Sequence, residues 1–459
     1  MRRCFARSGI ESKRRAIEEW GLAALALLVL AAPLWAQSGH HGHEGMKSVT
    51  GGPFQEVQAI GSGTALAPAT SPMPMWHFRA GQWDWMLHGE IKAGFNHQGG
   101  PRGIGKGESQ NWLMVMGERG AGPGRLILRG MFSAEPLTTP HGGFPQLFQA
   151  GESYRGIPII DAQHPHDLFM ELAVSYMVPL AEGASIFFYG GPVAEPALGP
   201  VAFMHRASAA ENPAAPLGHH MQDSTHISHG VITSGATLWR FRVEGSLFRG
   251  AEPDENRVDI EMGRLDSWST RISFTPDPDW VVQFSHGHLT EPEFLKLGDV
   301  ERTTASISYN RAWEQGNWAT TAVWGRAEGG GVSNSYLLES TLTLSDRNRL
   351  YTRLERVDQS LLFLPNVFGR PGLFSALPVR SVRGGIDLSP KFHFLPGLGA
   401  GRVGAYTVGG VRDVFAGSAF RLGVGGDVVF HDVPPVARPG YGSPMSVHLF
   451  FRVRPGKGP

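Results

Sequence analysis

Period-two alternation of apolar and polar residues is the feature that most constrains this 459-residue chain. Residues 239–247 read WRFRVEGSL, and a similar alternation recurs over 83–95, 420–431 and 446–454. Successive side chains of a β-strand point to opposite faces, so each segment would have one apolar and one polar face. After residue 36 no apolar run approaches the length of about 18 residues that a membrane-spanning helix needs.

Turn-forming residues separate the alternating segments. Residues 276–279 read PDPD, residues 314–317 read EQGN, and residues 345–348 read SDRN. Between such turns we count about 16 strands, with a range of about 14–18, from residue 83 onward. Most are about ten residues long, the length that a tilted strand needs to cross a bilayer. The pattern predicts an all-β fold, an antiparallel transmembrane β-barrel over residues 81–455.

The alternative to a membrane barrel is a soluble secreted β-protein, which would also have many short strands. A propeller would show a repeat of about 40–50 residues, and the sequence shows none. Many expected strands begin or end in tryptophan, as at Trp83, Trp239, Trp280 and Trp318. Aromatic girdles of this kind are typical of outer-membrane barrels. We therefore expect a location in the outer membrane, with its lipid as a partner.

The N-terminal residues resemble a secretory signal peptide. Basic residues over 1–19 precede an almost wholly apolar run over 20–32, and PLWA follows at 33–36. We expect residues 1–36 to be cleaved, with a retained anchor as the alternative. Residues 37–80 are rich in Gly, Ser, Pro and Thr, which predicts a flexible periplasmic tail.

Charge and cysteine content exclude two functional classes. Lysine and arginine number 41, as do aspartate and glutamate, so the basic balance that nucleic-acid binding needs is missing. Cys4 has no partner for a disulfide. The oligomeric state does not follow from the sequence.

Histidines gather in two places. The expected tail contains His40, His41 and His43. The second group flanks two long insertions near 136–166 and 192–225, and loops of that length are uncommon unless functional. Its members are His164, His166, Asp167, His205, His219, His220, Asp223 and His226.

These side chains are candidate metal ligands. Imidazole suits copper and zinc, and a site needs three or four convergent ligands. The expected cofactor is therefore a copper or zinc ion, with copper first. In the alternative interpretation the histidines make loop hydrogen bonds, with Asp167 and Asp223 as partners.

Other patterns give weaker signals. Glu135, Glu195, Glu252 and Glu291 each precede proline, which we interpret as turn chemistry on solvated loops. Serine, histidine and aspartate occur together over 223–229, but no motif of a nucleophilic serine surrounds them.

Five stretches resemble a family of Gram-negative outer-membrane β-barrel proteins for which no activity is established. They are HGEIKAGFNHQGG at 88–100, QHPHDLFMEL at 163–172, EPALGPVAFMHRASAAENPAAPLGHHMQDSTHI at 195–227, EPDENRVDIEMGRLD at 252–266 and NWATTAVWGR at 317–326. The resemblance covers roughly residues 70–455 and implies a barrel in the outer membrane. More distantly, the family is similar to outer-membrane copper-resistance proteins, whose tails are rich in His and Met. The tail here has few Met, which weakens the case for copper.

Three functional hypotheses follow. The leading hypothesis is the binding or passage of transition-metal ions, copper first, with a role in metal resistance. The first alternative is a porin-like channel for small solutes with structural histidines. The second is a barrel enzyme such as a hydrolase, although we expect no enzymatic activity and no catalytic residue.

Overall fold

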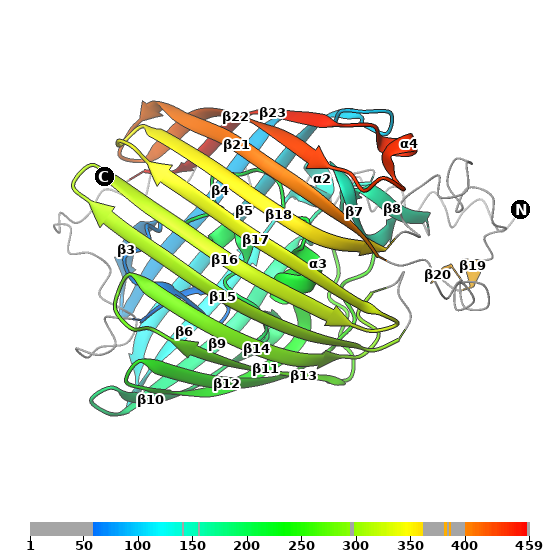
Figure 1. The fold of residues 1–459 in the computed structure, drawn as a ribbon. Coiled ribbons are helices and arrows are strands. Elements are labelled where there is room, and N and C mark those ends of the chain that lie inside the picture. Colours follow the sequence, from blue (N-terminus) through cyan, green and yellow to red (C-terminus); the bar gives the residue numbers. More distant parts are fainter. Residues whose placement is uncertain are drawn as a thin grey trace, which may run out of the picture.

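The computed structural model describes residues 58–139, 142–154, 157–293, 298–360, 381–382, 385–386 and 400–456. Within these residues sixteen antiparallel strands form one closed barrel (Figure 1). In chain order they are β4 (Trp83–His97), β5 (Gly105–Ala121), β6 (Gly124–Phe132), β9 (Phe169–Ala181), β10 (Ala184–Ala194), β11 (Ser228–Leu238), β12 (Phe241–Phe248), β13 (Ser267–Phe274), β14 (Trp280–Leu289), β15 (Val300–Trp313), β16 (Gly316–Glu328), β17 (Val332–Thr343), β18 (Asn348–Ser360), β21 (Ala400–Ala416), β22 (Phe420–Asp432) and β23 (Met445–Pro455). The predicted fold class and strand number are confirmed.

The barrel closes between its last and first strands. β23 pairs with the second half of β4, from Val447 opposite His97 to Val453 opposite Ile91. The short strand β3 (Trp76–Ala80) pairs with the first half of β4 and extends the barrel at this junction.

Exposure of the side chains decides between a membrane barrel and a soluble β-protein. On β12, Phe241, Val243 and Leu247 are 48%, 55% and 54% exposed, whereas Arg242 and Glu244 are buried in the interior. A soluble sandwich would bury the apolar face instead. An apolar exterior with a polar interior is the pattern of a barrel surrounded by lipid. The chain is therefore an outer-membrane β-barrel.

The two ends of the barrel differ in their connections. At one end the strands are joined by short turns, such as residues 122–123, 182–183 and 239–240. At the other end the connections include residues 133–168, 195–227 and 249–266 (Figure 1). Outer-membrane barrels have short turns on the periplasmic side and long loops outside. Among the described residues no helix is long and apolar enough to span a bilayer.

The remaining described elements belong to connections and to the N-terminal segment. They are β1 (Gln58–Ser62), β2 (Ala65–Pro68), β7 (Phe144–Tyr154), β8 (Ile157–Gln163), β19 (Ser381–Val382), β20 (Gly385–Ile386), α2 (Glu135–Thr138), α3 (His219–Gln222), α4 (Arg438–Tyr441), η2 (Phe203–His205) and η3 (Ser224–His226). Both predicted insertions are therefore long connections that contain short elements of their own.

The N-terminal segment differs from the expected flexible tail over 37–80. From Gln58 onward it forms β1 and β2, a hairpin that lies inside the barrel. Thr64 Oγ1 in its turn accepts a hydrogen bond from Arg271 of β13 at 2.8 Å. Polar groups of the inner wall thus hold this segment in place. Amino-acid composition does not reveal such contacts. The expected signal peptide and the tail histidines His40, His41 and His43 lie outside the described residues.

Candidate functional site

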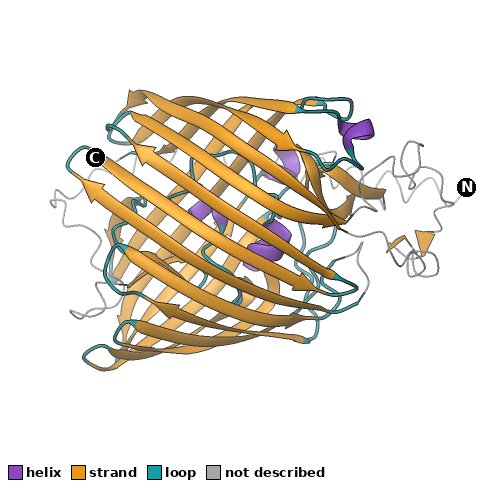
Figure 2. Cartoon of the chain, in the orientation of Figure 1, coloured by secondary structure: helices purple, strands orange, loops and turns teal. Residues whose placement is uncertain are grey.

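The connection over 195–227, here called the inner loop, crosses the barrel interior. It joins β10 to β11 and contains η2, α3 and η3. Figure 2 shows short helices within the outline of the barrel. Ala197, Leu198, Phe203 and Leu217 are almost fully buried, although the loop has little regular structure. Its residues therefore form the packed interior of the barrel.

Arg206 attaches the inner loop to the opposite wall. Its Nε lies 2.7 Å from Glu339 Oε1 of β17, and its Nη1 lies 2.7 Å from Asp223 Oδ2 of the same loop. Glu339 also accepts a hydrogen bond from Arg353 of β18 at 3.1 Å. All four side chains are at most 2% exposed. The attachment is a buried network in which each charge has an opposite partner.

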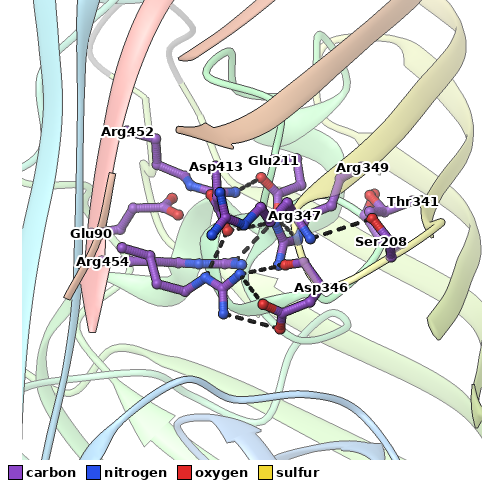
Figure 3. A network of polar contacts seen from close by, with 12 residues as sticks. Glu90, Ser208, Glu211, Thr341, Asp346, Arg347, Arg349, Asp413, Arg452 and Arg454 are labelled. Carbon is purple, nitrogen blue, oxygen red and sulfur yellow. Dashed lines mark hydrogen bonds and ion pairs between the residues drawn. The ribbon is translucent and has the colours of Figure 1, made fainter. Parts of the chain in front are cut away.

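Glu211 makes a second attachment (Figure 3). Its carboxylate pairs with Arg452 and Arg454 of β23, the latter at 3.2 Å, and with Arg349 of β18 at 3.3 Å. Asp413 of β21 supplies further negative charge to Arg452 and to Arg349. A single loop carboxylate thus meets three arginines of the barrel wall.

Five of the predicted histidines come together beneath the long loops. The ring centroids of His219 and His226 are 5.2 Å apart, and those of His166 and His226 are 5.4 Å apart. His220 lies 5.5 Å from His219 and 5.9 Å from His164. We call His164, His166, His219, His220 and His226 the histidine cluster.

Hydrogen bonds orient three rings of the histidine cluster. His166 Nδ1 lies 2.8 Å from Glu135 Oε2, and His219 Nδ1 lies 2.7 Å from Asp223 Oδ1. His226 Nδ1 lies 2.7 Å from the carbonyl oxygen of Asp223. These oxygens accept hydrogen bonds, so each Nδ1 carries the proton and each Nε2 keeps its lone pair. Metal-binding histidines are commonly oriented in this way.

The ligating atoms do not form a closed metal site. Among the described residues, one group of three carboxylate or imidazole ligands has all its atoms within 4.8 Å. That group is Asp254, Asp259 and Glu261 in the connection after β12, where two of the three side chains are exposed. The histidine cluster therefore brings the rings close without converging three ligand atoms.

Three other predicted ligands have different surroundings. Asp167 pairs with Arg257 at 3.2 Å rather than with a histidine. His205 lies on another side of the inner loop, with its ring centroid 5.7 Å from that of His88 and 4.7 Å from that of Trp112. Asp223 joins the histidine cluster to Arg206 and orients His219.

Two glutamates of the cluster's surroundings were missed by sequence reasoning. Glu135 is 0% exposed, and Glu252 lies with Oε2 3.5 Å from His220 Nδ1. Ser224 Oγ donates a hydrogen bond to Glu252 Oε1 at 2.9 Å. The interpretation of these Glu-Pro pairs as solvated turns is wrong, because the long loops fold inward. The feature of the sequence that could have revealed these two glutamates is their position in or beside histidine-rich loops.

Burial lowers the pKa of three histidines of the cluster, His164, His219 and His226. It lowers the pKa of His164 to about 3, and it lowers the pKa of His219 even though Asp223 opposes the shift. Burial alone would raise the pKa of Asp223, but Arg206 and then His219 hold it below its ordinary range. His219 and His226 are therefore favoured as neutral imidazoles beside the ionised carboxylate of Asp223.

The candidate serines are engaged with other groups. Ser224 donates to Glu252, and Ser228 Oγ donates to the carbonyl oxygen of Thr225 at 3.0 Å. A serine hydrolase needs its nucleophile within hydrogen-bond reach of a base such as histidine. The arrangement of these two serines does not favour the hydrolase hypothesis.

Open space in the barrel is unevenly distributed. A cavity of about 1280 Å³ reaches the short turns around Trp313 and Arg347. The two cavities beside the histidine cluster have a volume of only about 20 Å³ each. The interior is thus wide on the periplasmic side and filled by the loops on the other side.

Comparison with known proteins gives similarity in fold only. No known family model matches the chain, and no curated protein is similar to it. An anion-selective porin from Comamonas acidovorans is 10% identical, with a TM-score of 0.47 over 81% of this chain and 99% of the porin. OmpF of Salmonella typhi in complex with daunomycin is 9% identical, with a TM-score of 0.48 over 82% of this chain and 99% of OmpF. A loop-deleted OmpT of Vibrio cholerae is 8% identical, with a TM-score of 0.44 over 82% of this chain and 100% of OmpT.

Proposed function

We propose that the protein is a porin-like channel for small solutes and that the inner loop is its gate. The observation that carries the proposal is the cavity of about 1280 Å³, which reaches the short turns and is closed on the other side by the inner loop. Passage across the membrane then requires the inner loop to move.

The attachments of the inner loop support a movable gate. Arg206 and Glu211 hold it through ion pairs, in addition to the apolar contacts of residues such as Phe203. Water and ions compete for such pairs when the loop shifts, since charged groups are strongly solvated. The ion pairs define the closed position of the loop, and opening requires them to exchange their partners for water.

A reversible disulfide would test the gate. Ser208 of the inner loop donates a hydrogen bond to Thr321 Oγ1 of β16 at 2.8 Å, so cysteines at these positions are within bonding reach. The variant combines Ser208→Cys and Thr321→Cys with Cys4→Ser, which removes the one native thiol. In planar bilayers we expect the wild type to conduct, the oxidised variant to be closed, and a reductant to restore conductance.

Ser208→Cys alone, with Cys4→Ser, is the matched control and should conduct in both redox conditions. Absence of conductance in the wild type would contradict a channel. Equal conductance of the oxidised and reduced double variant would show that another element is the gate.

We propose metal binding by the histidine cluster as a second candidate function, with copper or zinc as the ion. The supporting observation is that His166, His219 and His226 each hold Nδ1 against an oxygen acceptor. The Nε2 atom of His226 is buried and has no hydrogen-bond partner among the described residues. Small movements of these rings would bring ligand atoms together.

Calorimetry on detergent-solubilised protein would test this candidate. We expect His166→Gln with His226→Gln to weaken zinc or copper binding at least tenfold, because two ligands are lost. His97→Gln on β4 is the control, since that side chain is exposed and outside the cluster. A chain lacking residues 37–50 tests the tail histidines. Loss of all binding on this truncation would assign the metal to the tail instead.

A further inference from the structure

The periplasmic cavity has two chemically different walls. One side carries charged groups such as Arg349, Arg421, Arg454 and Asp346. The other side carries thioethers, with Arg129 of β6 opposite Met116 of β5. The methionines that line the cavity are Met73, Met75, Met86, Met114, Met116 and Met177.

Strand register places part of this methionine wall in one patch. Met86 of β4 lies directly opposite Met116 of β5, and His88 lies opposite Met114. His77 of β3 lies opposite Met86 on the other side of β4. Directly opposite residues of antiparallel strands have Cβ atoms about 4.5–5.5 Å apart. Met86, Met114 and Met116 are therefore neighbours on one inward-facing surface.

The choice of methionine is specific to the inner face. Leu87, Leu113 and Val115 occupy the alternate positions of the same strands, which face outward toward lipid. Inward positions of a membrane barrel are normally polar. Here the outer face uses branched aliphatic side chains, whereas the inner face uses thioethers. Met114 and Met116 also pack against apolar residues of the inner loop such as Phe203, so these thioethers have a structural role as well.

Two histidines border the methionine wall with unused nitrogen atoms. His88 is 9% exposed, and its ring centroid lies 5.7 Å from that of His205. The Nδ1 atoms of both rings are buried without a hydrogen-bond partner among the described residues. A buried polar nitrogen without a partner is costly unless a ligand satisfies it.

We propose that Met86, Met114 and Met116, together with His88 and His205, bind a soft monovalent metal ion of the Cu(I) class. Thioether sulfur is a ligand that Cu(I) favours, and imidazole nitrogen is a suitable additional ligand. The site lies in the part of the barrel that is already open. The site is separate from the histidine cluster. Because His205 belongs to the inner loop, the complete site forms while that loop is docked.

Silver ion is a suitable probe because Ag(I) shares the soft character of Cu(I) and stays in one oxidation state. In the full chain with ¹³C-labelled methionine methyl groups, Ag(I) should shift the signals of Met86, Met114 and Met116. Zn(II) should leave these signals in place, because thioethers are poor ligands for it. X-ray absorption of the silver-loaded wild type should show sulfur scatterers.

The matched variants exchange sulfur for carbon at nearly constant volume. Met86→Leu with Met116→Leu should weaken Ag(I) binding at least tenfold, whereas Met262→Leu, at a side chain that is 63% exposed, should leave it unchanged. Unchanged methyl signals with Ag(I), or a silver shell without sulfur in the wild type, would overturn the proposal even if the double variant failed to fold. Neither result would bear on conductance.

Discussion

The inner loop is held in two contrasting ways. Toward β17, β18 and β23 it is fixed by Arg206 and Glu211, whose charges meet opposite charges of the wall. Toward the β8–β9 connection it meets the barrel through neutral rings, such as His219 and His226 near His166. Buried ion pairs fix the loop in one position, because a buried charge that loses its partner is strongly destabilising. Neutral imidazoles are instead able to take up a proton or an ion, so that side of the loop is the adjustable one.

Arg206→Gln breaks the charged attachment at its most buried point and should have the largest effect. It leaves Asp223 without its arginine and removes one of the two arginines at Glu339. Loss of one partner of a buried pair costs about 3–5 kcal/mol. Amide hydrogen exchange of residues 195–227 should therefore accelerate by roughly 10²–10⁴-fold through local opening. Unchanged exchange would show that the apolar contacts alone dock the loop.

Glu211→Gln tests the second charged attachment and should have a smaller effect. Arg452 and Arg349 keep Asp413 as a partner after the substitution. Hydrogen bonds to charged groups contribute about 1.5–3 kcal/mol, so loop exchange should accelerate by roughly 10–100-fold. The same measurement applies. An effect as large as that of Arg206→Gln would contradict the assigned role of Asp413.

Acidification should loosen the histidine side of the loop. Burial lowers the pKa of His164 to about 3 and also lowers that of His219, from an ordinary value near 6.5. The released loop would bind protons below about pH 6.5 that the docked loop does not bind, so docking is weakened as pH falls. Above that pH these histidines are neutral in both the docked and the released loop and do not weaken docking.

Glu195 at the start of the inner loop acts in the opposite direction. Burial raises its pKa to about 8 from an ordinary 4.5, so its contribution to docking is lost as pH rises between these values. The variant Glu195→Gln removes that contribution. In this background, loop exchange corrected for the intrinsic pH dependence should rise steadily from pH 7 to pH 4. A flat profile would rule out the histidines as the titrating groups.

The sequence predicted the barrel well because lipid and water impose a period of two on every wall strand. The alternation over 239–247 matches β12, and its apolar residues face outward as expected of a membrane barrel. The N-terminal hairpin of β1 and β2 could not be predicted in this way. Its strands are only 5 and 4 residues long and lie inside the barrel, where no lipid face imposes a pattern.

The candidate site was only partly predictable for a related reason. The sequence placed these histidines beside two long loops, and the structure brings five of their rings together, namely His164, His166, His219, His220 and His226. Periodicity does not set the direction of a loop side chain, so His205 facing His88 could not be foreseen. Inward folding of the loops, which buries Glu135, leaves no local pattern in the sequence.

A matched ion pair in solvent gives the smallest expected effect and tests whether burial is what matters. Arg311 Nη1 donates to Asp279 Oδ2 at 2.8 Å, close to the 2.7 Å of the Arg206 contacts, but the Arg311 side chain is 66% exposed. Water solvates both charges whether or not they pair, so an exposed pair contributes little. Arg311→Gln should leave both loop exchange and conductance unchanged. A change comparable to that of Arg206→Gln would mean that charge anywhere near the short turns controls the loop, and the contrast between its two sides would then not explain docking.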